Sequence, residues 1–156
     1  MFDLSGCFAS KEASLYRAEV SGSGRKVAVV SVSAANGADA LAVLVVEDDF
    51  FVRYDIADCL RDAGYAVIES ESGEQALALC KSGMSIDMIV TDINLGGSAS
   101  GWDVAKRFRS EKPDMPVVYI SGGQFDPERC VPDSVFVAKP YQNIDILSAC
   151  LRLRGK

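Results

Sequence analysis

Short apolar runs alternate with amphipathic stretches from residue 41 to the end of the chain. The runs have the length of strands and read AVLVV (42–46), YAVIES (65–70), IDMIVTD (86–92), MPVVYIS (115–121) and DSVFVAKP (133–140). A continuous apolar run such as the first is typical of a strand that is covered on both faces of a parallel sheet. The pattern predicts a sheet built from these runs.

The stretches between the runs have helical spacing. In the first stretch, apolar residues recur at Val52, Ile56, Cys59, Leu60 and Ala63. Gly64 follows them, as expected of a glycine that ends a helix.

Later stretches carry helix signals of their own. Ser72 and Gln75 have the spacing of a capping box at the start of a second helix, which Gly83 would end. WDVAKRFRS (102–110) predicts a third helix. YQNIDILSACLRL (141–153) predicts a last amphipathic helix whose apolar face is Ile144, Leu147 and Leu151.

Strands that alternate with helices indicate an α/β fold with a doubly wound, five-stranded parallel sheet. The connection between the fourth and fifth strands is short and contains Pro127 and Pro132. We therefore expect the fourth helix to be short or distorted.

Residues 1–41 differ from the rest of the chain. They are rich in Ser, Ala and Gly, and SGSGRK interrupts them. We expect a largely disordered extension in which VAVVSVS (27–33) is the segment with strand character. One domain is expected over 42–154, and because the chain ends at Lys156 directly after the last predicted helix, we expect a stand-alone domain with no attached effector.

Composition narrows the possible partners and the compartment. The chain has 156 residues and a formal net charge of −6, which argues against a surface for nucleic acid or an anionic membrane. No apolar run approaches the ~20 residues that span a bilayer, and the N-terminus lacks the basic region of a signal peptide. Scattered cysteines without a C-x-x-C pair, in a chain without histidine, favour a reducing, cytoplasmic setting.

Charged residues follow three of the apolar runs. Glu47 and Asp48 follow the first, Asp92 ends the third and Lys139 follows the fifth. The carboxyl ends of parallel strands meet at one edge of a sheet, so these charges should gather there. Three close carboxylates repel one another unless a cation lies among them, and hard oxygen ligands suit Mg²⁺. The chemistry indicated is phosphoryl transfer, with Asp49 as the cap of the helix that follows.

Four motifs carry a family resemblance: LVVEDD, VTDINL, YISGG and VAKPY, in this order, on the first, third, fourth and fifth predicted strands. In these motifs the chain resembles the receiver domain of two-component response regulators, over roughly residues 41–154. The resemblance implies a flavodoxin-like sheet with strand order 2-1-3-4-5.

The resemblance assigns roles around Asp92. It implies that Asp92 is the phosphoacceptor, that Asp48 and Asp92 bind Mg²⁺ directly, and that Glu47 assists through water. The main-chain carbonyl of Asn94 would supply a further oxygen. Lys139 would hold the phosphoryl oxygens, and its bond to Pro140 is expected to be cis.

The resemblance also implies a switch pair, Ser121 and Phe136. Ser121 would sense the phosphoryl group, whereas Phe136 lacks the hydroxyl of a tyrosine, so coupling would rest on ring packing. The segment after Ser121, GGQFDPERCVP, is short for the fourth helix of the family.

The partners implied are a sensor histidine kinase or a histidine phosphotransfer protein, and a downstream protein target that the sequence does not name. The chain would catalyse only its own phosphorylation and dephosphorylation, so it is not expected to be an enzyme in the wider sense. Of Phe50 and Phe51, we expect one to face the core and the other to lie at the rim of the site as a docking anchor, or to pack under the N-terminal extension.

Other readings of the same residues remain. One is a pseudo-receiver that binds partners without phosphorylation. Another is an aspartyl-phosphate hydrolase of the haloacid-dehalogenase type, but Asn94 cannot serve as the acid/base of its D-x-D motif, and the nucleophile would belong on the first strand. A flavodoxin-like electron carrier is disfavoured because the acidic residues of EDDFF would repel a flavin phosphate.

Overall fold

The computed structural model describes residues 14–15, 31–32, 40–123 and 125–154. Its main sheet has five parallel strands in the order β4-β3-β5-β6-β7. Counted from β3, this is the expected order 2-1-3-4-5, and the predicted doubly wound α/β fold is confirmed. The strands are β3 (Ala42–Val46), β4 (Ala66–Ser70), β5 (Met88–Asp92), β6 (Val117–Ser121) and β7 (Val135–Ala138).

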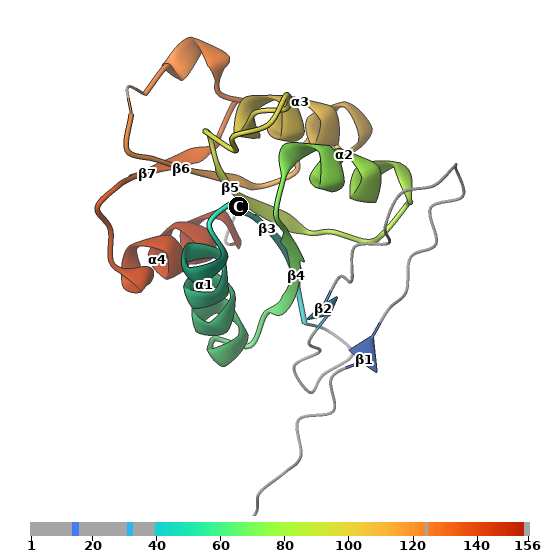
Figure 1. Cartoon of the computed structure of the whole chain (residues 1–156), viewed down its shortest axis with the longest axis vertical. Coiled ribbons are helices and arrows are strands. Elements are labelled where there is room, and N and C mark those ends of the chain that lie inside the picture. The colour runs from blue at the N-terminus through green and yellow to red at the C-terminus, as the bar shows by residue number, and fades with distance from the viewer. Residues whose placement is uncertain (1–13, 16–30, 33–39, 124, 155–156) are drawn as a thin grey trace, which may run out of the picture.

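Helices cover both faces of this sheet (Figure 1). One face carries α1 (Phe50–Asp62) and α4 (Asn143–Arg154), and the other carries α2 (Gly73–Lys81) and α3 (Gly101–Glu111). Each helix follows a strand of the sheet, so the loops at the carboxyl ends of the strands all open at one edge.

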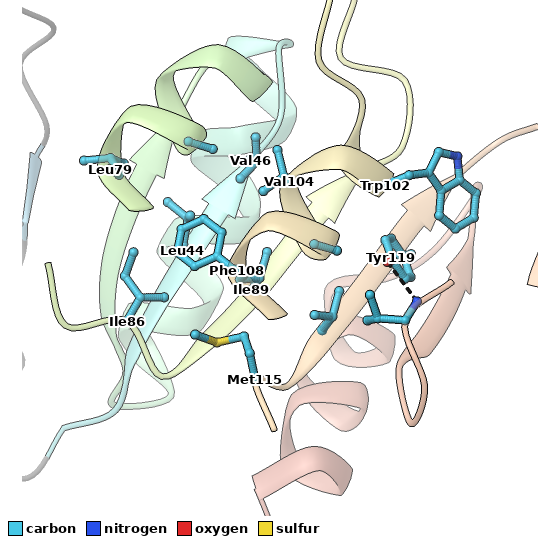
Figure 2. Packing of buried hydrophobic residues seen from close by; sticks show 14 of the residues in the cluster. Leu44, Val46, Leu79, Ile86, Ile89, Trp102, Val104, Phe108, Met115 and Tyr119 are labelled. Carbon is cyan, nitrogen blue, oxygen red and sulfur yellow. Dashed lines mark hydrogen bonds between the residues drawn. The ribbon is translucent and has the colours of Figure 1, made fainter. Parts of the chain in front are cut away.

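Two layers of core side chains lie on either side of the sheet. Successive residues of a strand point to opposite faces, so Leu44 and Val46 pack under α2 and α3 while Val43 and Val45 pack under α1 and α4. Phe108 and Trp102 of α3 complete the first layer (Figure 2). Each buried aliphatic side chain stabilises the fold by about 1.5–3 kcal/mol, which fixes the strands that carry the charged residues.

Capping side chains set where the helices begin. Asp49 caps α1 as predicted and accepts hydrogen bonds from the backbone N–H groups of Phe51 and Val52 at 2.8 and 3.0 Å. Ser72 caps α2 as predicted, but the Gln75 side chain accepts from the Glu71 N–H at 2.8 Å, so the predicted capping box is incomplete.

The predicted apolar face of the last helix is wrong at two of its three residues, since only Leu147 packs against the core. In α4 the residues that face the core are Ile146, Ala149, Cys150 and Leu153. Ile144 and Leu151 are 57% and 52% exposed. The helix carries two apolar stripes, and only the contacts with the sheet decide which of them is buried.

The segment between β6 and β7 is short, as predicted. Among its described residues, 122–123 and 125–134, it contains one 3-10 turn, η1 (Pro127–Arg129), in place of a full helix. Hydrogen bonds hold the segment that follows: the Val131 N–H donates to the Tyr119 hydroxyl at 3.3 Å, and the Arg109 side chain donates to the Pro132 carbonyl at 2.6 Å.

Two short strands precede the main sheet. β1 (Ser14–Leu15) and β2 (Ser31–Val32) pair antiparallel, and β2 contacts β4 (Figure 1). The strand character predicted for 27–33 is confirmed for these two residues of β2. Apart from these two strands and residues 40–41, the predicted extension lies outside the described residues, so its disorder and the boundary at residue 42 stay predictions. Within the described ranges, no helix combines the length and apolar character that crossing a bilayer requires.

Candidate functional site

Three carboxylates meet at the carboxyl edge of the sheet. Glu47 and Asp48 directly follow β3, and Asp92 is the last residue of the adjacent parallel strand β5. One carboxylate oxygen from each residue lies within 4.8 Å of the others, the one such acidic cluster found among the described residues. Glu47 and Asp92 are buried, at 2% and 6% exposure, while Asp48 is exposed.

Lys139 reaches this cluster from the end of β7. Its Nζ atom lies 3.2 Å from Oε2 of Glu47 and forms an ion pair with Oδ2 of Asp92. Its backbone N–H donates to the Ser121 carbonyl at 2.9 Å, which ties the lysine to the end of β6. The bond to Pro140 is cis, as expected. The structure therefore brings together the four charged residues that the sequence singled out.

Burial and mutual repulsion shape the charges of the site. Burial, followed by the negative charge of Asp92, raises the pKa of Glu47 to about 7, against the opposing effects of the Asp49 N–H and Lys139. Burial alone would lower the pKa of Lys139, but its hydrogen bond to Asp92 and the charge of Glu47 raise it above its usual value.

One ammonium group thus faces three carboxylates, which leaves the site with excess negative charge. The donor set is made of hard carboxylate oxygens, the ligands that Mg²⁺ prefers. The residues present therefore fit a magnesium ion. Asp48, which faces solvent, gives the cluster an open side.

The backbone around Asp92 is tightly packed. The Asn94 N–H donates to Oδ1 of Asp92 at 2.9 Å, and the Thr91 hydroxyl donates to the Asp92 carbonyl at 2.8 Å. A Cβ atom on Gly101 would overlap with this same carbonyl, so only glycine allows α3 to begin so close to the end of β5. The role of the Asn94 carbonyl as a metal ligand stays a prediction.

The proposed switch residues lie on the adjacent strands β6 and β7. Ser121 ends β6, next to β5, and is 2% exposed; its hydroxyl oxygen accepts from the Gly123 N–H at 3.1 Å. Phe136 in β7 is half-buried, and its ring centroid lies 4.3 Å from that of Phe125. Phe125 extends from the short segment that replaces the fourth helix.

The expectation that Phe50 or Phe51 faces the core is wrong. The two rings are 59% and 80% exposed, and Phe50 packs edge-on against Phe51 and stacks on Tyr54, with centroid distances of 5.5 and 6.3 Å. The inward positions of the first turn belong to Val52 and Arg53, which leaves both phenylalanines outside.

Arg53 is a site residue that the sequence interpretation missed. It is 8% exposed; its Nη1 donates to the Glu47 carbonyl at 2.7 Å and its Nε lies 3.5 Å from a Glu69 carboxylate oxygen. It thus fixes the backbone from which the acidic pair extends. The sequence carries one sign of this role: Arg53 has the helical spacing that places it on the same face of α1 as the buried residues Ile56 and Leu60.

Comparison with known proteins agrees with this geometry. Residues 43–150 match the model of the response regulator receiver domain. The chain belongs to this family. The resemblance seen in the sequence motifs is therefore confirmed, and the haloacid-dehalogenase and flavodoxin interpretations are set aside.

Individual receiver proteins are similar in sequence and fold. Two-component response regulator ORR6 of Oryza sativa subsp. japonica is 34% identical over 120 residues, which cover 72% of this chain and 70% of that protein. The crystal structure of a response regulator receiver protein from Sinorhizobium medicae WSM419 is 35% identical, with a TM-score of 0.74, covering 76% of this chain and 98% of that one. The receiver domain of the hybrid histidine kinase CckA is 27% identical, with a TM-score of 0.61, covering 72% of this chain and 97% of that one. The chain spans only 29% and 43% of the length of two other curated relatives.

Proposed function

We propose that this receiver accepts a phosphoryl group on Asp92 in a magnesium-dependent reaction and acts as a phosphorylation switch in two-component signal transduction. The observation that carries the proposal is the contact of Lys139 with Asp92 inside the cluster formed with Glu47 and Asp48. A buried carboxylate beside an ammonium group and further oxygen ligands suits an acceptor of a highly charged group.

The residues act on the phosphoryl group in turn. A carboxylate oxygen of Asp92 attacks phosphorus in line with the donor, the bond from phosphorus to the imidazole nitrogen of a partner's phosphohistidine breaks, and that nitrogen keeps the electron pair. Asp48 and Asp92 would hold magnesium directly, with Glu47 through water and the Asn94 carbonyl as a further ligand. When bound, the metal neutralises charge on the transferred oxygens.

Lys139 takes a new partner after transfer. The Asp92 oxygen that it contacts becomes part of an acyl phosphate, so the ammonium group can move to a phosphoryl oxygen and stabilise the product. Slow attack of water on phosphorus then restores Asp92 and releases inorganic phosphate.

Ser121 and Phe136 would pass the change on. Ser121 lies at the end of β6; its hydroxyl oxygen accepts from the Gly123 N–H, and its hydroxyl hydrogen would be donated to a phosphoryl oxygen. Phe136 carries no hydroxyl, so its response would consist of ring repacking against Phe125.

An exposed aromatic cluster of α1, made of Phe50, Phe51 and Tyr54, supports docking of a kinase or phosphotransfer protein. Phe51 and Tyr54 line a hollow that continues to Lys139 and Pro140. A partner seated there would present its phosphohistidine beside Asp92. The stretch that follows along α1 is acidic, with Asp58 and Asp62 among the residues of the next groove.

Acetyl phosphate labelling tests the proposal. The full-length protein is incubated with magnesium and acetyl phosphate, and its intact mass is measured. We expect a gain of one phosphoryl group in the wild type and in Asp58→Asn, an exposed acid of α1, and no gain in Asp92→Asn or without magnesium. Labelling of Asp92→Asn to the wild-type level would refute the site. A wild type that accepts no phosphoryl group from either acetyl phosphate or a kinase would favour the phosphorylation-independent binding module.

A further inference from the structure

Glu74, in the first turn of α2, holds the loop that follows Asp92. Its Oε1 accepts hydrogen bonds from the Ser98 N–H at 2.7 Å, the Ser98 hydroxyl at 2.6 Å and the Ala99 N–H at 3.1 Å. The donors belong to residues 24 and 25 positions after Glu74 in the chain. Because three donors from one loop converge on a single carboxylate oxygen, the contact is specific.

The same loop lies between Glu74 and the acidic cluster. A Cβ atom on Gly97 would lie 2.8 Å from both carboxylate oxygens of Glu74, and one on Gly96 would lie 3.1 Å from Oδ2 of Asp48. Gly96 also has a φ of 62°, which favours glycine. Adjacent glycines therefore let the backbone approach Glu74 on one side and Asp48 on the other.

The charge of Glu74 is secured by the contacts that it makes. The Ser98 hydroxyl, then the Glu74 and Ser98 backbone N–H groups, lower the pKa of Glu74 to about 2. The carboxylate is therefore ionised at neutral pH, where hydrogen bonds to a charged acceptor are stronger than neutral ones.

We infer that Glu74 is a positioning residue for the metal site: it fixes the loop over residues 94–99, and with it the Asn94 carbonyl and the Gly96 backbone against Asp48. The inference rests on the proposed function, because it concerns magnesium bound by Asp48 and Asp92. Residues that orient ligands without touching the metal change metal affinity by about 10–100-fold when they are replaced.

The test compares Glu74→Gln and Gly97→Ala with Glu71→Gln in the full-length protein. The first two variants disturb the contact from opposite sides. Glu71 is an exposed acid just before α2, so its replacement removes the same charge near the same helix end. For each protein, calorimetric titration with magnesium gives the dissociation constant, and urea unfolding without magnesium gives the stability.

We expect the magnesium dissociation constant to rise about tenfold in Glu74→Gln and Gly97→Ala and to stay unchanged in Glu71→Gln. Amide hydrogen exchange of Ser98 and Ala99 should accelerate in the first two variants only. Ser98→Ala, which removes one of the three hydrogen bonds, keeps the test valid if a variant fails to fold, and should give a smaller rise.

If Glu74 has a purely structural role, Glu74→Gln lowers the free energy of unfolding and leaves the magnesium dissociation constant unchanged. That result would overturn the inference. If the wild type itself binds magnesium and Glu74→Gln binds it equally well, only this inference fails. If the wild type binds no magnesium, the proposed function fails with it.

Discussion

Asp48 differs from the other carboxylates of the site because it faces solvent and is not part of the Lys139 contacts. Lys139 pairs with Glu47 and Asp92, so removing Asp48 leaves those ion pairs in place. We predict that Asp48→Ala raises the magnesium dissociation constant at least about tenfold, because the variant lacks a carboxylate that we propose as a direct ligand. NMR titration with magnesium measures the change.

Asp49→Asn is the matched control for this prediction. It removes a charge one residue away but keeps an oxygen that can cap α1 at the Phe51 and Val52 N–H groups. Its magnesium affinity should stay close to that of the wild type. Equal weakening in both variants would mean that general charge, and not ligation by Asp48, governs binding.

Glu47 makes the stability of the metal-free protein depend on pH. Its pKa is raised from 4.5 to about 7 in the folded state, so the folded protein binds a proton more tightly than the unfolded chain does. This contribution to the free energy of unfolding is fully present below about pH 4.5 and is lost as the pH rises through about 7. We predict that the free energy of unfolding in the presence of a chelator falls between about pH 4.5 and about pH 7.

Glu47→Gln cannot release that proton, so its stability should vary less over the same range of pH. Urea unfolding of both proteins at several pH values gives the comparison. A wild type whose metal-free stability increases with pH in this window would contradict the burial of an ionisable Glu47.

At the scale of elements, the segment between β6 and β7 depends on a few side-chain contacts. The Phe125 ring packs on Phe136, with Phe125 42% exposed. We predict that Phe125→Ala lowers the free energy of unfolding by about 1 kcal/mol, the usual value of an aromatic pair. Amide exchange over residues 125–134 should accelerate more than exchange in the main strands.

Phe51→Ala serves as the control for stability, because that ring is 80% exposed. Its free energy of unfolding should change by less than about 0.5 kcal/mol. If Phe125→Ala also changes the free energy of unfolding by less than about 0.5 kcal/mol and leaves amide exchange over residues 125–134 unchanged, the ring pair does not hold the segment.

The elements that sequence patterns predicted well are those with a single dominant period. The five main strands and the charges at their ends follow from apolar runs and from the rule that parallel strands end at a common edge. The buried face of α4 could not be predicted, because the stripe of Ile144, Leu147 and Leu151, of which only Leu147 packs against the core, is as regular as the one that the sheet selects.

The same limit applies within the site. The role of Glu74 was hidden because its partners lie 24 and 25 residues further along the chain, and an acid in a first helical turn is normal without any partner. The exposure of both Phe50 and Phe51 was missed because a charged residue, Arg53, occupies the buried position of the first turn of α1.

At the scale of the whole molecule, the core is complete from Leu41 onward among the described residues. We predict that deletion of residues 1–40 changes the free energy of unfolding by less than about 1 kcal/mol and leaves labelling by acetyl phosphate intact. The deletion keeps Leu41, whose carbonyl accepts from the Ala66 N–H at 3.0 Å. Because β2 contacts β4, a large fall in melting temperature would show instead that β2 is an integral part of the fold.

The exposed aromatic cluster of α1 gives a prediction about partners. Phe51→Ala and Phe50→Ala are each assayed with acetyl phosphate and with a histidine kinase that phosphorylates the wild type. We predict that at least one variant loses kinase transfer about fivefold or more, as expected for a docking anchor, while acetyl phosphate labelling is preserved. Leu151→Ala, on the exposed stripe of α4, is the control. Equal effects on both donors in each variant would contradict docking at this cluster.

The packing around Trp102 gives the protein an optical probe of its own. The indole is the only one in the chain and is 3% exposed, its ring lies 4.8 Å from that of Tyr119, and the Arg129 guanidinium lies 5.4 Å from its centroid. It thus joins the start of α3, which packs against the Asp92 backbone, to the η1 turn between β6 and β7. A shift of η1 would move the Arg129 guanidinium away from the Trp102 indole and expose the indole to collisional quenchers such as acrylamide. The tryptophan fluorescence of the unlabelled protein would therefore report movements of this segment in real time.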